Sequence, residues 1–323
     1  MKGGTIRVKK YIVTGLNMLD ALELTGGTKI PPHMGGIPMY GFCGMRLWTD
    51  SIQYVARVGK DFFDLFDPWF SNNHIDPAGL HFVSDKTPYN VMIFDETQNT
   101  ADSGYFFTGN WADSDFYRPH PEDLLPLMSE ETKGLYLTSG PEPEKVWDHM
   151  FERRDKFGFK IMWEPNNQHT YANDGTPIQS LLDQIEMASF NVPEGCRIFG
   201  KATERELLDF LRRQKPELIL LRCGSRGLYT IHDGRAWFIP SAPLPEGMEV
   251  VDVTGCGNTS TAGACCAWCE GNDPIMTGIM ANISANYNLR QIGPYPNFTD
   301  DVVREAHVFA RKLYADGNYY EVD

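Results

Sequence analysis

The sequence predicts a three-layer α/β/α protein with a mainly parallel central sheet and a small β lid. Short apolar segments recur at residues 11–15, 135–138, 159–163 and 218–222. Amphipathic helical segments separate them, at residues 144–157 and where Ile178, Leu181, Leu182 and Ile185 repeat at helical spacing. Alternating strands and helices imply parallel strands covered on both faces. The 323 residues contain no fixed repeat and no linker, so we expect one domain spanning 1–323.

Two segments depart from this alternation. Residues 90–95 and 103–108 flank a polar turn and resemble an antiparallel pair. We expect lid strands within about 15–40 and 85–112, over a substrate site; an ordinary edge hairpin is the alternative. Residues 228–239 predict a second hairpin around Asp233-Gly234, a dipeptide suited to a type I′ turn.

Composition and charge narrow the class of partner. The chain carries 29 basic and 43 acidic residues, a formal net charge of −14, and 42% hydrophobic residues. No dense Lys/Arg run is present, so we expect neither nucleic acid nor membrane as a partner. No apolar run is long enough to span a membrane, the N-terminal residues lack a signal-peptide pattern, and seven cysteines suggest free thiols. We therefore expect a cytoplasmic protein.

A glycine-rich turn is the most informative segment. Residues 252–258 read Asp-Val-Thr-Gly-Cys-Gly-Asn, and small residues follow at 259–264. This pattern predicts a turn that opens a helix lying close to the sheet. Glycines let the backbone approach an anion, and the unpaired amides of a first helical turn point at it. A free nucleotide can bind there even though the chain is acidic overall.

The turn resembles the second signature of the ribokinase/PfkB carbohydrate kinase family, in which Asp-Thr-x-Gly-Ala-Gly-Asp precedes a helix. Asp252, Thr254, Gly255 and Gly257 match that signature, Cys256 replaces Ala, and Asn258 replaces the final Asp.

Other landmarks of the family follow in the expected order, from about residue 11 to residue 293. They are Gly15 with Asp20, Gly35-Gly36 with Pro38, the Val-Gly-x-Asp element in residues 57–61, Glu164-Pro165-Asn166, Asn191-Val192-Pro193-Glu194, Arg222-Cys223-Gly224-Ser225-Arg226-Gly227, and Ala281-Asn282. Tyr40 stands where the family usually has Asn after the di-glycine, and Glu164 stands in place of Asp.

The resemblance implies transfer of the ATP γ-phosphoryl group to a hydroxyl of a sugar, nucleoside or polyol. It implies that substrate binds to Asp20, Gly35 and Gly36, and that the anion hole is formed by the amides of Gly255, Cys256 and Gly257. It also implies that Glu194 holds hydrated Mg²⁺. The residues expected to border the nucleotide are Asn191, Arg222, Gly224, Gly227, Thr254 and Asn282. A requirement for a monovalent cation stays open. Simpler alternatives are a turn cap for Asp20, a solvated surface acid for Glu194, and a pure turn role for Gly224 and Gly227.

Asn258 is the main departure from the family pattern, since relatives use the final Asp as the general base. An amide cannot take a proton near neutral pH. Three hypotheses follow. The chain is a kinase in which another group, for example Glu164, takes the proton; or it is a binding or regulatory protein that lost turnover; or it uses the site for chemistry without ATP.

Cysteines and aromatic residues give secondary expectations. Cys265, Cys266 and Cys269 lack a partner pair for zinc, so we interpret them as packing residues. Cys256 lies at a predicted helix N-terminus, a position that lowers a thiol pKa and would suit a redox switch. Tyr105, Phe106, Phe107 and Trp111 suggest a lid that stacks on substrate or forms a homodimer contact.

Overall fold

A computed structural model describes residues 8–23, 27–94, 100–106, 114–138, 145–165 and 176–323. Within these residues, ten strands form one sheet in the order β14-β13-β12-β11-β10-β9-β8-β1-β4-β5. The strands are β1 Tyr11–Thr14, β4 Ile52–Gly59, β5 Leu80–Ser84, β8 Gly134–Thr138, β9 Lys160–Glu164, β10 Met187–Asn191, β11 Leu218–Arg222, β12 Gly227–His232, β13 Arg235–Pro240 and β14 Tyr320–Val322. From β11 to β5 every neighbouring pair is parallel, which confirms the predicted sheet.

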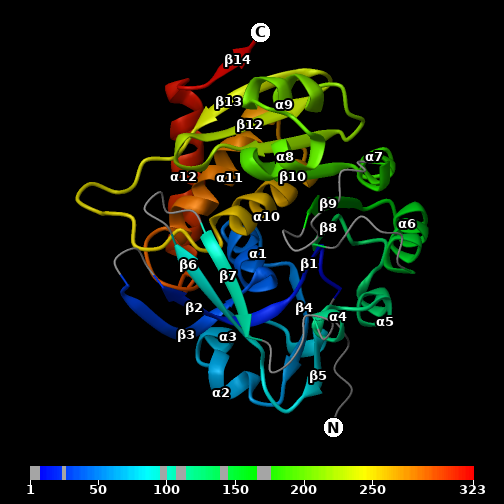
Figure 1. The fold of residues 1–323 in the computed structure, drawn as a ribbon, viewed down its shortest axis with the longest axis vertical. Coiled ribbons are helices and arrows are strands. Elements are labelled where there is room, and N and C mark those ends of the chain that lie inside the picture. The colour runs from blue at the N-terminus through cyan, green and yellow to red at the C-terminus, as the bar shows by residue number, and fades with distance from the viewer. Residues whose placement is uncertain (1–7, 24–26, 95–99, 107–113, 139–144, 166–175) are drawn as a thin grey trace.

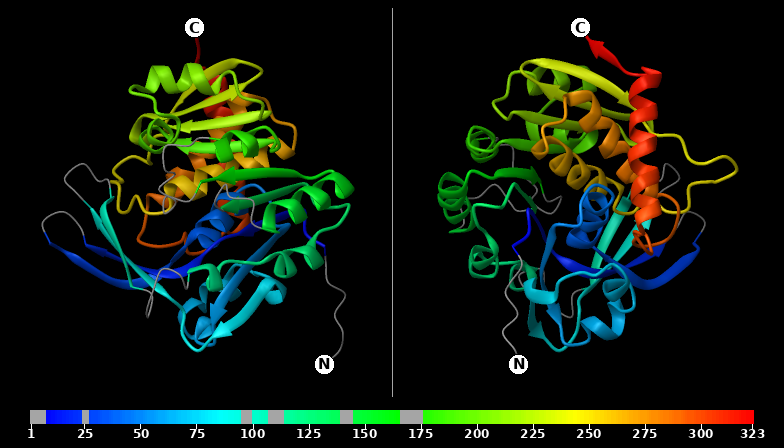
Figure 2. Two further views of the ribbon diagram at one scale, coloured as in Figure 1. Left: turned by 45° about the vertical axis from the view of Figure 1, so that its right-hand side comes forward. Right: turned by 180° about the vertical axis from the view of Figure 1, so that it is seen from behind.

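Helices cover both faces of this sheet, and Figure 2 shows them on opposite sides of the strands. One face carries α1 Ile37–Arg46, α10 Cys256–Cys269, α11 Pro274–Asn288 and α12 Asp300–Asp316. The other carries α5 Pro121–Leu124, α6 Lys145–Phe157, α7 Thr176–Leu182, α8 Val192–Phe199 and α9 Glu204–Leu211. Short elements complete the chain: α2 Phe62–Phe66, α3 Trp69–Asn72, α4 Ser114–Tyr117, and single 3₁₀ turns at η1 Pro77–Gly79, η3 Leu125–Leu127 and η4 Gly224–Arg226.

A small four-stranded sheet lies to one side of the main sheet, in blue and cyan in Figure 1. Its order is β3-β2-β6-β7, with β2 Asn17–Glu23, β3 Lys29–Gly36, β6 Tyr89–Phe94 and β7 Thr100–Phe106. β6 and β7 are antiparallel, as predicted, and β6 also pairs with β2. The pair therefore belongs to a separate small sheet, with β7 at its edge, and the lid role of this sheet stays a prediction.

The predicted second hairpin lies near one edge of the main sheet, with β14 pairing outside it. β12 and β13 pair in register from Gly227–Pro240 to His232–Arg235. Asp233 and Gly234 both have positive φ, 47° and 74°, as a type I′ turn requires. The hairpin prediction is confirmed.

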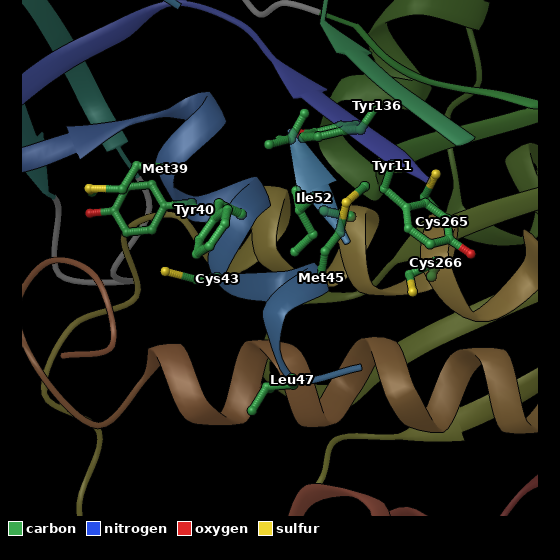
Figure 3. Packing of buried hydrophobic residues seen from close by; sticks show 14 of the residues in the cluster. Tyr11, Met39, Tyr40, Cys43, Met45, Leu47, Ile52, Tyr136, Cys265 and Cys266 are labelled. Atoms are coloured by element: carbon green, nitrogen blue, oxygen red, sulfur yellow. The ribbon is translucent and has the colours of Figure 1, made fainter. Parts of the chain in front are cut away.

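Alternate residues of the parallel strands divide the core between the two helical layers. In β8, Tyr136 belongs to the cluster beneath α1 and α10, whereas Leu135 and Leu137 belong to the cluster on the other face. Figure 3 shows Tyr40 and Cys43 of α1 in the first cluster, together with Tyr136 and with Cys265 of α10. Within the described residues, no helix is both long and apolar enough to cross a membrane.

Candidate functional site

Polar residues gather where the parallel strands end. Glu164 is the last residue of β9, Asn191 of β10 and Arg222 of β11, and these strands are adjacent and parallel. Ligands of such sheets bind beyond the carboxyl ends of the strands. The carboxyl edge of the sheet therefore brings these three predicted residues together.

The start of α10 is built differently from the starts of most long helices here. Side chains of Asn191, Thr203, Asp273 and Thr299 cap α8, α9, α11 and α12. The residue before α10 is Gly255, which has a left-handed φ of 77° and makes no side-chain cap. The first amides of α10 thus have no capping side chain, and a helix N-terminus of this kind favours an anion.

Arg222 lies against this helix start. A Cβ atom on Gly257 would be 2.1 Å from Arg222 Nη1, so the guanidinium occupies the space that a side chain at 257 would fill. Arg222 Nη2 is 2.6 Å from Glu164 Oε1 and 4.0 Å from Glu194 Oε2. Burial lowers the pKa of Arg222, but the two glutamates outweigh burial and raise it overall. A permanent positive charge therefore stands beside the first turn of α10.

Asn258 is held by a second set of contacts in the same cluster. Its Nδ2 donates to Tyr136 Oη at 3.0 Å and to Glu164 Oε2 at 3.3 Å, and Tyr136 Oη donates to Glu164 Oε2 at 2.5 Å. A carboxylate only accepts hydrogen bonds, so the amino group of Asn258 must face Glu164. Burial raises the pKa of Tyr136 well above its usual value, which keeps this phenol a donor. Neither of these two contacts uses the side-chain oxygen of Asn258.

The Asn-x-x-Glu motif is a capping box at the start of α8. Asn191 Oδ1 accepts from the Glu194 amide at 2.8 Å, and Glu194 Oε2 accepts from the Asn191 amide at 3.4 Å. Glu194 is 5% exposed, and burial raises its pKa to about 7. The alternative of a solvated surface acid was therefore wrong.

Glu194 also fits a hydrated metal better than a directly bound one. The hydrogen bond to Asn191 and the approach of Arg222 both use Oε2, so Oε1 is the oxygen that could bind a water of Mg²⁺. Those residues contain no group of three His, Cys, Asp or Glu that could hold a metal ion by themselves. Mg²⁺ usually keeps several waters and adds substrate phosphates, which is compatible with a single carboxylate.

Asp20 and the di-glycine form a second group of predicted residues. The Gly36 amide donates to Asp20 Oδ2 at 3.3 Å, and a Cβ on Gly35 would be 2.0 Å from the same oxygen. The Asp20 carboxylate thus lies directly on bare backbone, within β2 rather than at a turn, so the turn-cap alternative was wrong. Burial raises the pKa of Asp20 to about 7, although the Gly36 hydrogen bond opposes this.

Tyr40 connects the cluster at the start of α10 with the group formed by Asp20 and the di-glycine. A Cβ on Gly255 would be 2.2–2.5 Å from three atoms of the Tyr40 ring, so the ring lies against the turn that opens α10. Tyr40 is 2% exposed, and after burial the charges of Asp20 and Asp252 contribute most to raising its pKa. The sequence marked Tyr40 only as a departure from Asn, and it gave no sign of Tyr136, which reads as an ordinary strand residue.

Other residues of the predicted site hydrogen-bond to nearby backbone groups or form turns. Asp252 Oδ1 accepts from the Thr254 amide at 2.8 Å, which orders the turn. Gly227 has a φ of 127° and Gly224 a φ of 61°, so both meet a turn requirement. Asn282 donates to the carbonyls of Ile239 and Pro240 at 3.1 and 2.9 Å, and none of its hydrogen bonds to described residues reaches Arg222 or Asn258.

The prediction for Cys256 was wrong. Cys256 is half-buried, its thiol is directed at the Ala285 carbonyl at 3.7 Å, and desolvation raises the pKa of this thiol to about 12. Desolvation outweighs the helix dipole here, because the thiolate would have to form without water. Cys256 is therefore unsuited to a redox switch. The side chains of Tyr105 and Phe106, and residues Phe107, Trp111 and Asn166, lie outside the described residues.

Comparison with known proteins agrees with this geometry. The model of the pfkB family carbohydrate kinases matches residues 34–300, and the chain belongs to this family. The uncharacterized protein C16C9.01c of Schizosaccharomyces pombe is 21% identical over 320 residues, covering 88% of this chain and 85% of that protein.

Solved structures show the same fold. A nucleoside kinase of Burkholderia thailandensis in complex with inosine has a TM-score of 0.73 at 14% identity, over 94% of this chain and 98% of that one. The aminoimidazole riboside kinase of Salmonella enterica, with aminoimidazole riboside and an ATP analog, has a TM-score of 0.70 at 16% identity, over 93% and 99%. At such identities the likeness concerns the fold alone.

Proposed function

We propose that this chain transfers the γ-phosphoryl group of ATP to a hydroxyl of a small sugar, nucleoside or polyol. The observation that supports this most is the position of Tyr40. Its ring lies on Gly255, and the charges of Asp20 and Asp252 help to raise the pKa of its phenol. Tyr40 therefore lies close both to a hydroxyl-binding carboxylate and to an anion-binding helix start, which supports one site for both. A phosphoryl donor and a hydroxyl acceptor need both.

The chain's own groups suit a loose transition state, in which charge spreads over the oxygens of the moving phosphoryl. The first amides of α10 and the guanidinium of Arg222 would neutralise that charge. The Asn258 carbonyl oxygen would accept a hydrogen bond from the attacking hydroxyl and orient it. Mg²⁺, held through water by Glu194 and by the nucleotide, would offset the charge of the phosphates.

Glu164 is our proposed proton acceptor. Its carboxylate is 3.3 Å from Asn258 Nδ2, but one oxygen binds Arg222 and the other accepts from Tyr136 and Asn258. While Arg222 holds it, both oxygens of this carboxylate are occupied by protein contacts and neither is free to accept from a substrate hydroxyl. If Arg222 turns to the nucleotide, one oxygen of Glu164 is released.

A second candidate function is a nucleotide- or sugar-binding regulatory protein that has lost turnover. The contact of Asn258 with Glu164 favours it, because an amide rather than a base occupies the position next to the anion hole. General-base catalysis typically contributes about 10²–10⁴-fold in rate. Binding of both ligands would survive the loss.

An ATP-consumption screen over sugars, nucleosides and polyols tests both candidates, with native protein beside Asn258→Asp. Native turnover at rates of about 1–100 s⁻¹, typical of kinases, would exclude the regulatory candidate. A silent native protein with an active Asn258→Asp variant would support it. If calorimetry detects no ATP binding to the native protein, the kinase and the nucleotide-binding regulator both fail, and a sugar-binding regulator or chemistry without ATP remains.

A further inference from the structure

Three polar residues form a row across the small sheet. Asp20 of β2 is the register partner of His33 in the antiparallel strand β3 and of Asn90 in the parallel strand β6. Register partners on neighbouring strands point to the same face of a sheet, with strands about 4.8 Å apart. His33, Asp20 and Asn90 therefore stand side by side on one face, over about 10 Å.

The hydrogen-bonding state of Asn90 follows from its neighbour. The Asn90 side chain hydrogen-bonds the Asp20 carboxyl, and because the ionised carboxylate only accepts, Asn90 uses its Nδ2 there above about pH 7. The other end, Oδ1, is buried and has no partner among the described residues, in a side chain that is 5% exposed. Asn90 thus presents an unpaired acceptor.

His33 presents the same kind of group. Its Nδ1 is 3.1 Å from the Pro31 carbonyl, which can only accept, so Nδ1 carries a hydrogen. In the neutral imidazole the other nitrogen, Nε2, is then an acceptor. Nε2 is buried and has no partner within the described part of the chain. With the Asp20 carboxylate between them, the row offers three acceptors.

Buried acceptors without partners destabilise the folded protein, so their arrangement calls for donors from a ligand. The surrounding charge sets a second condition. Asp252 adds to the negative field at Asp20, and no Lys or Arg among the described residues contributes to the pKa of Asp20. Among the described residues, a phosphate or carboxylate on this side of a ligand would face these three acceptors and the negative charges of Asp20 and Asp252.

We infer that the row His33–Asp20–Asn90 selects a neutral, polyhydroxylated substrate, and that it rejects acceptor compounds carrying a phosphate or carboxylate group on that side. The inference rests on the proposed function, because it assigns the acceptor half of that site. It adds His33 and Asn90 as specificity-determining residues beside Asp20.

The test is binding of matched neutral and anionic compounds to the full chain, measured by calorimetry at millimolar concentrations. Suitable pairs are ribose and ribose 5-phosphate, fructose and fructose 6-phosphate, glucose and gluconate, and adenosine and AMP. We expect at least one neutral member to bind, and no anionic member to bind more tightly than its parent when ATP is absent. An anion that binds more tightly than its parent through this row, shown by loss of binding in Asn90→Leu, would overturn the inference.

Variants then test the row itself. We expect Asn90→Leu and His33→Phe each to raise the Kd of the best neutral ligand about fivefold to tenfold, the usual effect of one neutral hydrogen bond. Val91→Thr, on the opposite face of β6, is the matched control and should leave the Kd unchanged. Kd values within twofold of native for both row variants would show that the row does not contact the ligand.

Different experimental outcomes would overturn the inference about the row and the proposed kinase function. A native protein that binds ATP but none of the neutral compounds would overturn this inference and leave the nucleotide site intact. A native protein that binds neutral compounds through the row but no ATP would overturn the proposed kinase function and leave the row assigned. The melting temperature of each variant, measured without ligand, distinguishes a lost contact from a lost fold.

Discussion

Arg222 and Glu164 form an ion pair of 2.6 Å across the carboxyl edge of the sheet, although β10 lies between their strands. The guanidinium also lies against Gly257 at the start of α10. If this helix start binds the terminal phosphate of ATP, as the proposed function requires, the phosphate and the Glu164 carboxylate would compete for the Arg222 guanidinium. That competition makes opposite predictions for the two residues.

We predict that Arg222→Gln weakens nucleotide binding and that Glu164→Gln strengthens it. Losing a charged hydrogen bond to phosphate should raise the Kd for ATP about tenfold or more. Removing the Glu164 charge frees the guanidinium and removes a repulsive carboxylate, so the Kd should fall severalfold. Calorimetric titration with ATP measures both.

Arg57→Gln is a matched control for Arg222→Gln. Arg57 is 11% exposed in its side chain, against 12% for Arg222, and pairs with Asp123 at the same 2.6 Å. It belongs to β4 and contacts α5, away from α10. We expect a loss of stability without a change in ATP affinity. If Arg222→Gln and Glu164→Gln change the affinity in the same direction, the ion pair is structural and does not exchange with phosphate.

We predict that Gly257→Ala lowers both the stability of the protein and its affinity for ATP. Alanine is a better helix former than glycine by about 1 kcal/mol, so Gly257→Ala should stabilise an ordinary helix turn. Here the new Cβ would be 2.1 Å from Arg222 Nη1, and the guanidinium would have to leave Glu164. We expect a net loss of stability, together with weaker ATP binding.

A double-mutant cycle checks this explanation. In the Arg222→Gln background the clash is gone, so Gly257→Ala should become neutral or stabilising in urea unfolding. Additive changes in the free energy of unfolding would show that position 257 rejects a side chain for some other reason.

The fold and half of the site could be predicted from the sequence. The conformation of turns, strands and helices depends mainly on residues that are close together in the chain. Gly255 before a run of small residues predicts a left-handed turn and a closely packed helix, and both are present. Tyr136 and the Arg222–Glu164 pair could not be predicted, because strand ends that are remote in sequence meet only in the sheet. Cys256 was misjudged for a related reason: burial is a tertiary property, and it reversed the expected direction of the pKa.

We predict an unusual pH dependence of stability from Asp20 and Glu194. Burial raises the pKa of each carboxyl to about 7 in the folded protein, above its value in the unfolded chain. The folded state therefore binds more protons between about pH 4 and pH 7, so these groups favour folding at low pH, and that stabilisation is lost as the pH rises through 7.

Asp20→Asn measures the contribution of one group. The amide has the same shape and no ionisation, so the variant should melt several degrees higher than native at pH 8 and similarly at about pH 4 or below. Binding of a neutral polyol should weaken about tenfold or more, since a charged acceptor is lost. An equal difference in melting temperature at both pH values would show that Asp20 does not titrate near neutrality.

Restoring a carboxylate at position 258 should create a coupled pair. Asn258 Nδ2 is 3.3 Å from Glu164 Oε2, so Asn258→Asp places two carboxyls at hydrogen-bond distance, and like charges this close cannot both ionise readily. One of the two should keep its proton near neutrality. The variant should therefore lose stability relative to native as the pH rises from about 5 to 8, and any phosphoryl transfer it gains should increase over the same interval.

The double variant Asn258→Asp with Glu164→Gln separates this coupling from the substitution itself. With a single carboxylate left, Arg222 can pair with it, and its pKa should fall well below neutrality. We expect the pH dependence of the melting temperature to return to that of native protein, and the rate to become independent of pH above about 6. If the single variant shows no pH-dependent loss of stability, the Asn258–Glu164 contact does not exist in solution. The proposal that Glu164 receives the proton would then lose its geometric basis.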